Sequence, residues 1–237
     1  MPRRPSAARR WLTALTWPVG VTLTAWDYMW RSTPMHRAEV AAAAGGDDLP
    51  PPYPEGVDDG EVQPAQSGQG PLFHRRYRTR IRESGLTAPG LMRKLAIDLN
   101  QAAPTAFARF QKVYGDSGRL GVGDEYVVRM PGPWDGPVRV VAVDEASFRL
   151  ATLAGHLEAG QIEFRALSTD PMVFEIESWA RSADRLADLL YHRAHMAKEI
   201  QLHMWISFLE GVTRLSGGRM TGGIEIDTRR IDDPFPA

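Results

Sequence analysis

From Gly121 to about residue 180, apolar and polar residues alternate with a period of two, and this alternation constrains the fold more than any other feature. Alternation of this kind is typical of strands that bury one face. It predicts strands at 123–130, 136–144, 146–153, 161–167 and 171–180. The connections between these segments are too short for crossover helices, so neighbouring strands should be antiparallel.

The segments on either side of this strand region predict further elements. An earlier strand at 71–82 carries Phe73, Tyr77 and Ile81 on one face. Helices are expected at 88–100 and 103–115, the second because its aromatic residues form a helical stripe. After the last strand, one long helix should run from about Ser182, which can cap it, to Leu215 before a glycine pair.

This order of elements predicts an α+β fold, in which a bent antiparallel sheet wraps around a long C-terminal helix. The order resembles the helix-grip fold of the START and Bet v 1-like superfamily. That fold usually has seven strands, whereas six are counted in this sequence, so one is missing or hidden. The resemblance implies a cavity between sheet and helix that takes an apolar ligand.

Three motifs resemble a narrower group, the uncharacterised protein family 0548, which is a domain of unknown function. They are VGDEYVVRMPGPWDGPVRVV, SFRLATLAGHLEAGQIEFRA and VFEIESWARSADRL. The strongest match is a Thr-Leu-x-Gly-His-x-Glu-x-Gly turn at 152–160, followed by a Phe-Glu-Ile-x-Ser strand at 174–178. The resemblance covers about residues 71–220 and implies no established reaction or cofactor.

The charges divide the chain into three predicted parts. Residues 1–37 hold six arginines and one acid, and we expect a basic, tryptophan-rich helical segment there. Residues 38–70 hold seven acids and no lysine or arginine, and their many Pro, Gly and Ala residues predict a disordered linker. Residues 71–230 are then the helix-grip-like domain.

Three interpretations of the first segment stay open. It is an amphipathic helix that packs on the domain or on a partner, a membrane-surface or spanning anchor, or an export signal after Arg9-Arg10. The uncharged window from Trp11 to Trp26 is shorter than the roughly 20 residues of a membrane-spanning helix. We expect a helix from Pro18 to Trp30 that stays with a cytoplasmic protein, with residues 11–30 as the candidate contact to a membrane surface or protein partner.

Composition excludes several classes of chemistry. With no cysteine, the chain has neither disulfides nor thiolates. The 28 basic and 29 acidic residues give a net charge of −1, so no nucleic-acid partner is indicated. The sequence contains neither a glycine-rich phosphate loop nor a Ser-His-Asp arrangement, and no cofactor is predicted.

The turn between the strands at 146–153 and 161–167 carries His156 and Glu158 between two glycines. One interpretation makes them an acid–base pair at the mouth of the cavity. The other has them bonding loop amides to hold the bend. We favour the structural role, with both residues near a pocket entrance, because no nucleophile stands beside them.

Two rows of polar residues have competing interpretations as well. On the last helix, His192, His195, Glu199 and His203 share one face, and the last three have metal-ligand spacing. We expect this row to face water without a metal. On the first strand, His74, Arg76, Arg78, Arg80 and Arg82 share a face that is able to bind anions. We expect Glu175 and Glu177 of the last strand to neutralise these arginines across the sheet.

The leading functional hypothesis is non-catalytic binding of a small apolar molecule or lipid between the sheet and the C-terminal helix. The candidate lining residues are Tyr126, Val128, Phe148, Leu150, Ile162, Phe164, Phe174 and Ile176. The alternative is an interaction or peripheral-membrane protein with a filled core. An enzyme that uses the His/Glu row of the last helix comes third.

Overall fold

The computed structural model describes residues 33–41, 48–57, 59–105, 108–116, 118–130, 135–183, 196–232 and 234–235, with the helix side chains of 196–200 left aside. The two described α-helices are α2 (Ala88–Ile97) and α4 (Met196–Ser216). The strands are β1 (Met35–Ala41), β2 (Gln69–Arg82), β3 (Arg109–Tyr114), β4 (Glu125–Arg129), β5 (Gly136–Val143), β6 (Ser147–Thr152), β7 (Glu158–Leu167), β8 (Met172–Ser182) and β9 (Arg219–Ile231).

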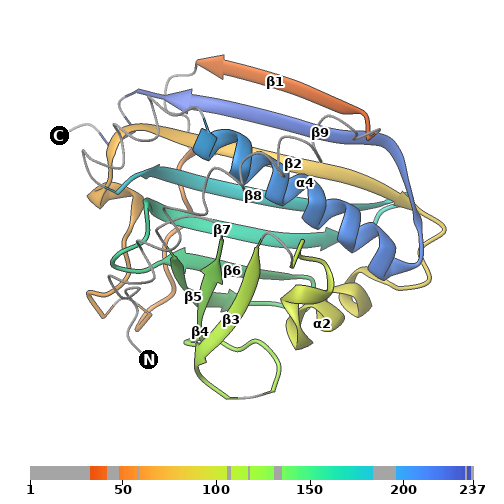
Figure 1. Ribbon diagram of the computed structural model, residues 1–237, viewed down its shortest axis with the longest axis horizontal. Coiled ribbons are helices and arrows are strands. Elements are labelled where there is room, and N and C mark those ends of the chain that lie inside the picture. Colours follow the sequence, from red (N-terminus) through yellow and green to blue (C-terminus); the bar gives the residue numbers. More distant parts are fainter. Residues whose placement is uncertain are drawn as a thin grey trace, which may run out of the picture.

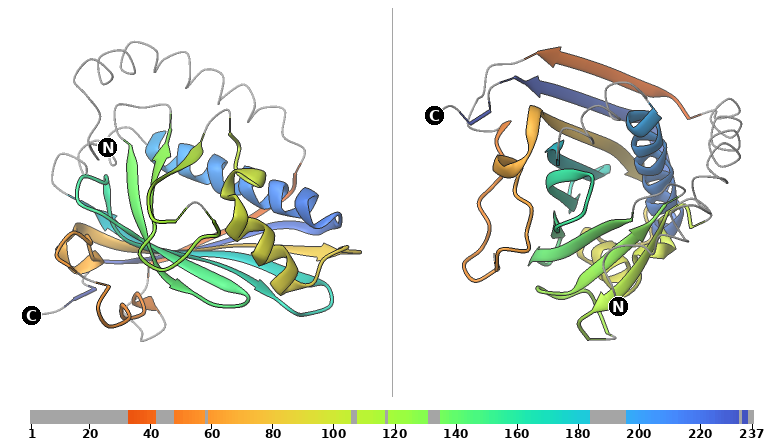
Figure 2. Two further views of the ribbon diagram at one scale, coloured as in Figure 1. Left: turned by 90° about the horizontal axis from the view of Figure 1, so that it is seen from below. Right: turned by 60° about the vertical axis from the view of Figure 1, so that its left-hand side comes forward.

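All of these strands join one sheet in the order β1-β9-β2-β8-β7-β6-β5-β4-β3. Neighbours are antiparallel, except that β1 runs parallel to β9. Strands β3 to β8 follow one another as a meander, whereas β2 lies between β8 and β9, which come much later in the chain. The sheet is bent, and α4 lies along its concave face (Figures 1 and 2).

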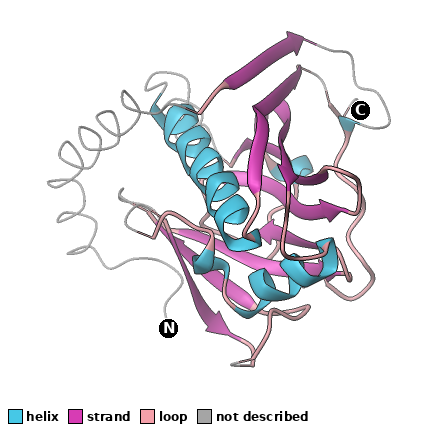
Figure 3. Cartoon of the chain, turned by 90° about the vertical axis from the view of Figure 1, so that its right-hand side faces the viewer, coloured by secondary structure: helices cyan, strands magenta, loops and turns pink. Residues whose placement is uncertain are grey.

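The core lies between the concave face of the sheet and the helices. On α4, Phe208, Leu209 and Val212 are completely buried, and α2 adds further buried side chains to the same core. The α2 helix lies beside the C-terminal half of α4 (Figure 3). The backbones approach closely here, because a Cβ atom at Gly211 would collide with the carbonyl oxygen of Ala102. The predicted α+β fold, with a bent sheet around a C-terminal helix, is confirmed.

The predicted helix at 103–115 is wrong. Residues 109–114 form β3, which pairs with β4 at the edge of the sheet. The stripe that suggested a helix also fits a strand, because Phe110 is buried in the core while its neighbours at 109 and 111 are exposed. Pairing with β4 stabilises the strand, so the helical period of this segment is not realised. The other predicted helix is α2, which ends at Ile97 and is followed by a 3-10 turn at Leu99–Gln101.

The predicted start of the long helix at Ser182 is also wrong, because Ser182 is the last residue of β8 and pairs with Glu158 of β7. The described part of the helix begins at Met196, and residues 184–195 lie outside the described residues. The predicted end is confirmed: α4 stops at Ser216, and Gly217 follows with φ of +72°, a left-handed conformation that suits glycine.

Three strands were not predicted from the sequence. β3, which was read as a helix, is the seventh strand that the predicted order lacked before the long helix. β9 follows that helix as an additional strand, and its glycines and many charged residues hid the alternation. Gly223 lies so close to the carbonyl oxygen of Pro34 that a Cβ atom would collide with it, which brings β1 alongside β9. β1 itself falls where a helical segment and a linker were expected.

A few residues of the predicted linker pack against the sheet. Val62 and Ala65 are buried against the outer, convex face of the sheet, and Val62 bridges to Leu153. The segment is too polar to fold alone, but its few apolar side chains pack against apolar residues of the sheet. The division of the chain at residues 37 and 70 stays a prediction.

No helix among the described residues is long and apolar enough to cross a bilayer. The predicted helix from Pro18 to Trp30 lies outside the described residues.

Candidate ligand-binding site

A cleft of about 450 Å³ opens where the end of α2 meets the edge strand β3. Ile97 and Tyr114 on its rim are 62% and 68% exposed, although both are large apolar side chains. Exposed apolar residues that gather around a hollow mark a contact surface more often than single ones do. The cleft is lined by Ile97, Asp98, Leu99, Asn100, Phe110, Lys112, Val113, Tyr114, Gly115, Gly118 and Tyr126.

Phe110 and Tyr126 connect this cleft to the core. Both line the cleft, and both belong to the apolar cluster between sheet and helices, where they are 5% and 8% exposed. The Phe110 ring lies edge-on to Phe208 of α4, with 6.4 Å between centroids. The inner wall of the cleft is therefore a layer of core side chains.

Lys112 supplies a fixed positive charge in the cleft. Its ammonium group donates to Asp124 Oδ2 at 2.6 Å and to the carbonyl oxygen of Asp116 at 2.7 Å. Burial is the largest single influence and opposes the charged form, but the hydrogen bonds and charges of Asp124 and Tyr126 together outweigh it and raise the pKa of Lys112. Burial raises the pKa of Tyr126, because it disfavours the phenolate. The centroid of the Tyr126 ring lies 5.4 Å from the Lys112 ammonium group. Lys112 is thus a charged anchor and not a neutral nucleophile.

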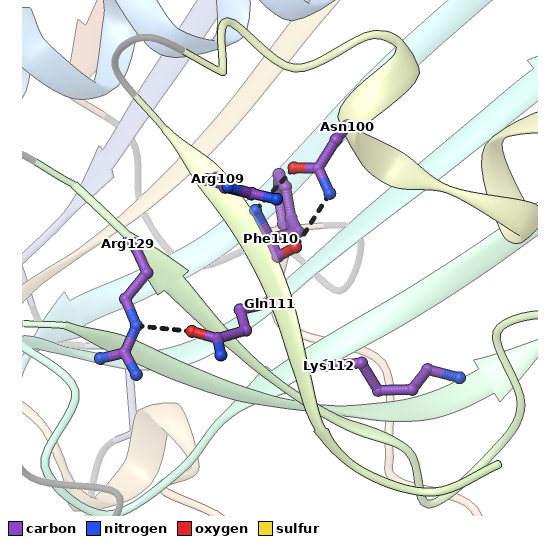
Figure 4. A pocket seen from close by; sticks show the side chains of 6 residues that line it. All are labelled: Asn100, Arg109, Phe110, Gln111, Lys112 and Arg129. Atoms are coloured by element: carbon purple, nitrogen blue, oxygen red, sulfur yellow. Dashed lines mark hydrogen bonds between the residues drawn. The ribbon is translucent and has the colours of Figure 1, made fainter. Parts of the chain in front are cut away.

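A second cleft, of about 590 Å³, adjoins the first, because both are lined by Asn100, Phe110 and Lys112. The Asn100 amide accepts from the Phe110 N–H and donates to its carbonyl oxygen, both at 2.9 Å (Figure 4). It therefore pairs with the free edge of β3 as a neighbouring strand would. Arg129 and Gln111 bond to each other at 3.1 Å, on the side of β3 away from Asn100 (Figure 4).

The eight predicted lining residues share the inner face of the sheet. Seven are buried members of the core cluster, and Ile162 packs against it. Phe148 stacks on Phe164 with 4.9 Å between centroids, and Phe164 contacts Phe208 at 5.3 Å. Among the eight, Tyr126 alone is in the lining of the two clefts described above.

A partly buried row of three hydrogen-bonded polar side chains marks the other end of the concave face. Arg75 of β2 donates to Gln201 Oε1 at 3.2 Å, and Gln201 Nε2 donates to Glu158 Oε2 at 3.0 Å. Arg75 is 4% exposed and lies over the Phe73 ring at 4.6 Å. These three side chains tie β2, α4 and β7 together and form a polar end of the interior.

Backbone hydrogen bonds fix the position of His156 in the turn at 153–157. The Glu158 N–H donates to His156 Nδ1 at 2.9 Å, and Gln63 Nε2 donates to the carbonyl oxygens of both residues. Burial lowers the pKa of His156, which favours the neutral ring. The Glu158 carboxylate instead reaches Gln201. These contacts support the structural interpretation of the turn, and the role of the two residues at a pocket mouth stays a prediction.

The predicted cross-strand neutralisation on the outer face is confirmed. Arg78 pairs with Glu175, and Arg76 Nε donates to Glu177 Oε1 at 2.6 Å. Arg80 bonds instead to Glu225 of β9. Arg76, Arg78 and Arg80 are thus paired with acids from the two neighbouring strands.

His74 in the same row is buried between two carboxylates. Its Nδ1 lies 3.1 Å from Asp48 Oδ1, and its Nε2 lies 2.7 Å from Glu177 Oε1. All three residues are 2% exposed, and the His74 ring stacks on Trp179 at 5.3 Å. Because Asp48 belongs to the packed N-terminal stretch, this contact fastens that stretch to the sheet.

The His/Glu row on the last helix falls largely outside the described residues, which exclude His192, His195 and the side chain of Glu199. His203 is 5% exposed, so it does not face water as expected. No group of metal-binding side chains occurs within the described ranges.

The cleft residues Ile97, Asn100, Lys112 and Tyr114 were not predicted from the sequence. A helix over 103–115 would have placed Lys112 and Tyr114 on different faces, so no cleft was visible. The available signal was Gly115, which has φ of +102° and lies so close to the Asp124 carboxylate that a Cβ atom would collide with it. A glycine of this kind ends a strand at a tight turn as readily as a helix.

Solved structures with a related shape are distant in sequence. A protein from Mycobacterium smegmatis is 16% identical, with 59% of this chain and 89% of that chain covered and a TM-score of 0.37. A major latex-like protein from ginseng, Panax ginseng, is 14% identical, with 56% and 98% covered and a TM-score of 0.38. Norcoclaurine synthase from Thalictrum flavum, solved with dopamine and hydroxybenzaldehyde, is 15% identical, with 68% and 92% covered and a TM-score of 0.37.

No curated protein matches the chain at a significant level. A family model does match, over residues 67–207, and its description is "Domain of unknown function (DUF1990)". The match spans more than half of the chain and includes β2 to β8 and the first half of α4. The chain therefore belongs to the DUF1990 family, as the motifs in its strands and turn predicted.

Proposed function

We propose that this protein binds a small, largely apolar molecule without catalysing a reaction, and that the ligand enters through the cleft between α2 and β3. One observation carries the proposal: the exposed apolar rim of the cleft leads directly to Phe110 and Tyr126, which are core residues. An apolar ligand in this cleft would cover the Ile97 and Tyr114 side chains and gain the free energy of their burial.

The predicted lining of the inner face belongs to the same proposal. Phe148, Phe164 and their neighbours pack closely, so a ligand that reaches them must displace core side chains, beginning with Phe110. The edge position of β3 favours such an opening, because β4 pairs with one side of it while Asn100 holds the other side by a single side chain.

The partners that we propose follow from the same surface. They are small apolar molecules or lipids, and nucleic acid is not among them. Contact of residues 11–30 with a membrane surface or a protein partner, in a cytoplasmic protein, stays a prediction from the sequence. Fractionation of the full-length protein tests it, because a mature N-terminus near Ala44 in an extracytoplasmic fraction would identify an export signal instead.

Native mass spectrometry of the purified protein, followed by solvent extraction, tests for a retained apolar ligand. A binding assay with 1-anilinonaphthalene-8-sulfonate then locates the site. We expect Ile97→Ala to weaken binding of this dye severalfold, because it removes apolar area from the cleft. The matched control is Val40→Ala, which alters a 57% exposed side chain on β1, at the opposite edge of the sheet. Equal dye binding by both variants would contradict the proposed site.

A further inference from the structure

The indole nitrogen of Trp205 is a buried hydrogen-bond donor without an acceptor. Trp205 is 6% exposed, and no group among the described residues accepts from its Nε1. Its ring lies edge-on to Phe164 and Phe208, with centroids 5.6 and 6.2 Å away. Buried donors are rarely left unpaired, because they give up their bonds to water on folding, so an isolated N–H in an apolar core requires an explanation.

The polar side chain one turn away on the same face of α4 is already engaged. Gln201 lies one helical turn before Trp205 and therefore on the same face. Its amide oxygen accepts from Arg75, and its amide nitrogen donates to Glu158, so both ends of the amide are engaged elsewhere. The hydrogen-bonded group of Arg75, Gln201 and Glu158 therefore ends one helical turn before Trp205.

The proposed entry cleft leads toward this indole. Phe110 lines the cleft and contacts Phe208, and Phe208 in turn contacts Trp205. A molecule that displaces the Phe110 ring therefore meets Phe208 and then Trp205. Two aromatic side chains separate the opening from the unpaired donor.

We propose that the ligand carries one uncharged acceptor oxygen, such as a ketone, aldehyde or ester carbonyl, which accepts from Trp205 Nε1 while an apolar body fills the space beside it. This inference rests on the proposed function and deepens it. An ionised acceptor does not suit the site, because the rings of Phe164 and Phe208 supply no opposite charge. Arg75, the nearby cation, lies at the polar end with Gln201.

The probes for the test are naphthalene and 2-acetylnaphthalene, which share a ring system and differ by one carbonyl group. Equilibrium dialysis of the full chain gives the affinity for each. The ratio of ketone to hydrocarbon affinity should fall about fivefold to tenfold in Trp205→Phe, the size of one net hydrogen bond. Comparing ratios between proteins cancels the difference in water solubility of the two probes.

Trp179→Phe is the matched control. Trp179 is 4% exposed and its Nε1 also has no acceptor among the described residues, but it packs on the outer face of the sheet against His74. The affinity ratio of this variant should equal that of the unchanged protein. An equal fall in both variants would overturn the inference, because it would trace the effect to destabilisation.

A measurement on the unchanged protein covers the case in which Trp205→Phe does not fold. With ¹⁵N-labelled tryptophan, 2-acetylnaphthalene should move the Trp205 indole signal downfield and naphthalene should not. Contacts of that indole with the Phe164 and Phe208 rings assign the signal. If both probes bind and neither moves the signal, the inference fails and the proposed function stands. If neither probe binds, the proposed function fails with it.

Discussion

Replacing Glu177 by glutamine should destabilise the protein more at neutral pH than in acid. The Glu177 side chain is 3% exposed and accepts from His74 at 2.7 Å and from Arg76 at 2.6 Å, while Arg165 also pairs with it. Burial opposes the charged carboxylate, but these bonds and the positive charges outweigh it and lower the pKa of Glu177 from 4.5 to about 2. The folded protein thus holds this carboxylate in its ionised form.

The size and sign of the effect follow from linkage between proton binding and folding. A pKa lowered from 4.5 to about 2 corresponds to roughly 3 kcal/mol of stability. Solvent around Arg76 and Arg165, whose side chains are 32% and 31% exposed, screens the charges, so we expect about 2 kcal/mol. Because the folded pKa lies below the unfolded one, this stability is complete above about pH 5 and is lost as the pH falls from 4.5 toward 2.

Urea unfolding of the unchanged protein and of Glu177→Gln, at pH 7, 5 and 3.5, measures the difference. The gap in the free energy of unfolding should be widest at pH 7 and should narrow toward pH 3.5, since acid removes the contribution from the unchanged protein alone. Glu225→Gln is the control, because Glu225 and Arg80 form an exposed pair that is worth about 1 kcal/mol or less. A gap for Glu177→Gln that does not change with pH would refute the reasoning.

Three further substitutions test the packing around the cleft and the core, each by thermal or urea unfolding. Gly211→Ala should destabilise the protein by about 1–3 kcal/mol, because the new Cβ collides with the Ala102 carbonyl oxygen and forces α4 outward; an unchanged midpoint would contradict this close approach. Asn100→Ala should cost about 1–2 kcal/mol and speed hydrogen exchange at the Phe110 amide, and slow exchange there would show that β3 does not depend on the side chain. Phe164→Ala should cost about 3–5 kcal/mol, since the ring is fully buried between sheet and α4, and a smaller loss would indicate a loosely packed interior.

Strands that bury one face were predictable from the sequence, and residues whose partners lie far along the chain were not. The alternation located the five strands β4 to β8. The short turns between them correctly predicted that consecutive strands pair with each other. The Arg78–Glu175 pair followed from the expected order of strands. By contrast, the aromatic residues of β3 fit both a helix and a strand, and the distant pairing of β9 with β1 is visible only in the folded sheet.

The candidate site divides in the same way. Side chains such as Phe164 and Ile176 were placed on the inner face from periodicity alone. The cleft depends on where the 3-10 turn at Asn100 stops against β3, and that is a property of tertiary packing. Whether the Trp205 indole has an acceptor depends on side chains that are distant in sequence, so no local sequence pattern predicts it.

The position of β2 in the sheet also has a consequence for how the chain is made. This strand is fourteen residues long, but its two partners begin only at Met172 and Arg219, so it waits unpaired for most of synthesis on the ribosome. A long strand with free edges is prone to aggregate with other copies. The arginines at alternate positions from Arg76 to Arg82 give the nascent strand a strong positive charge until the acids of β8 and β9 have been synthesised, and like-charged strands repel one another. The same side chains that form ion pairs in the finished sheet thus protect the unfinished one from self-association.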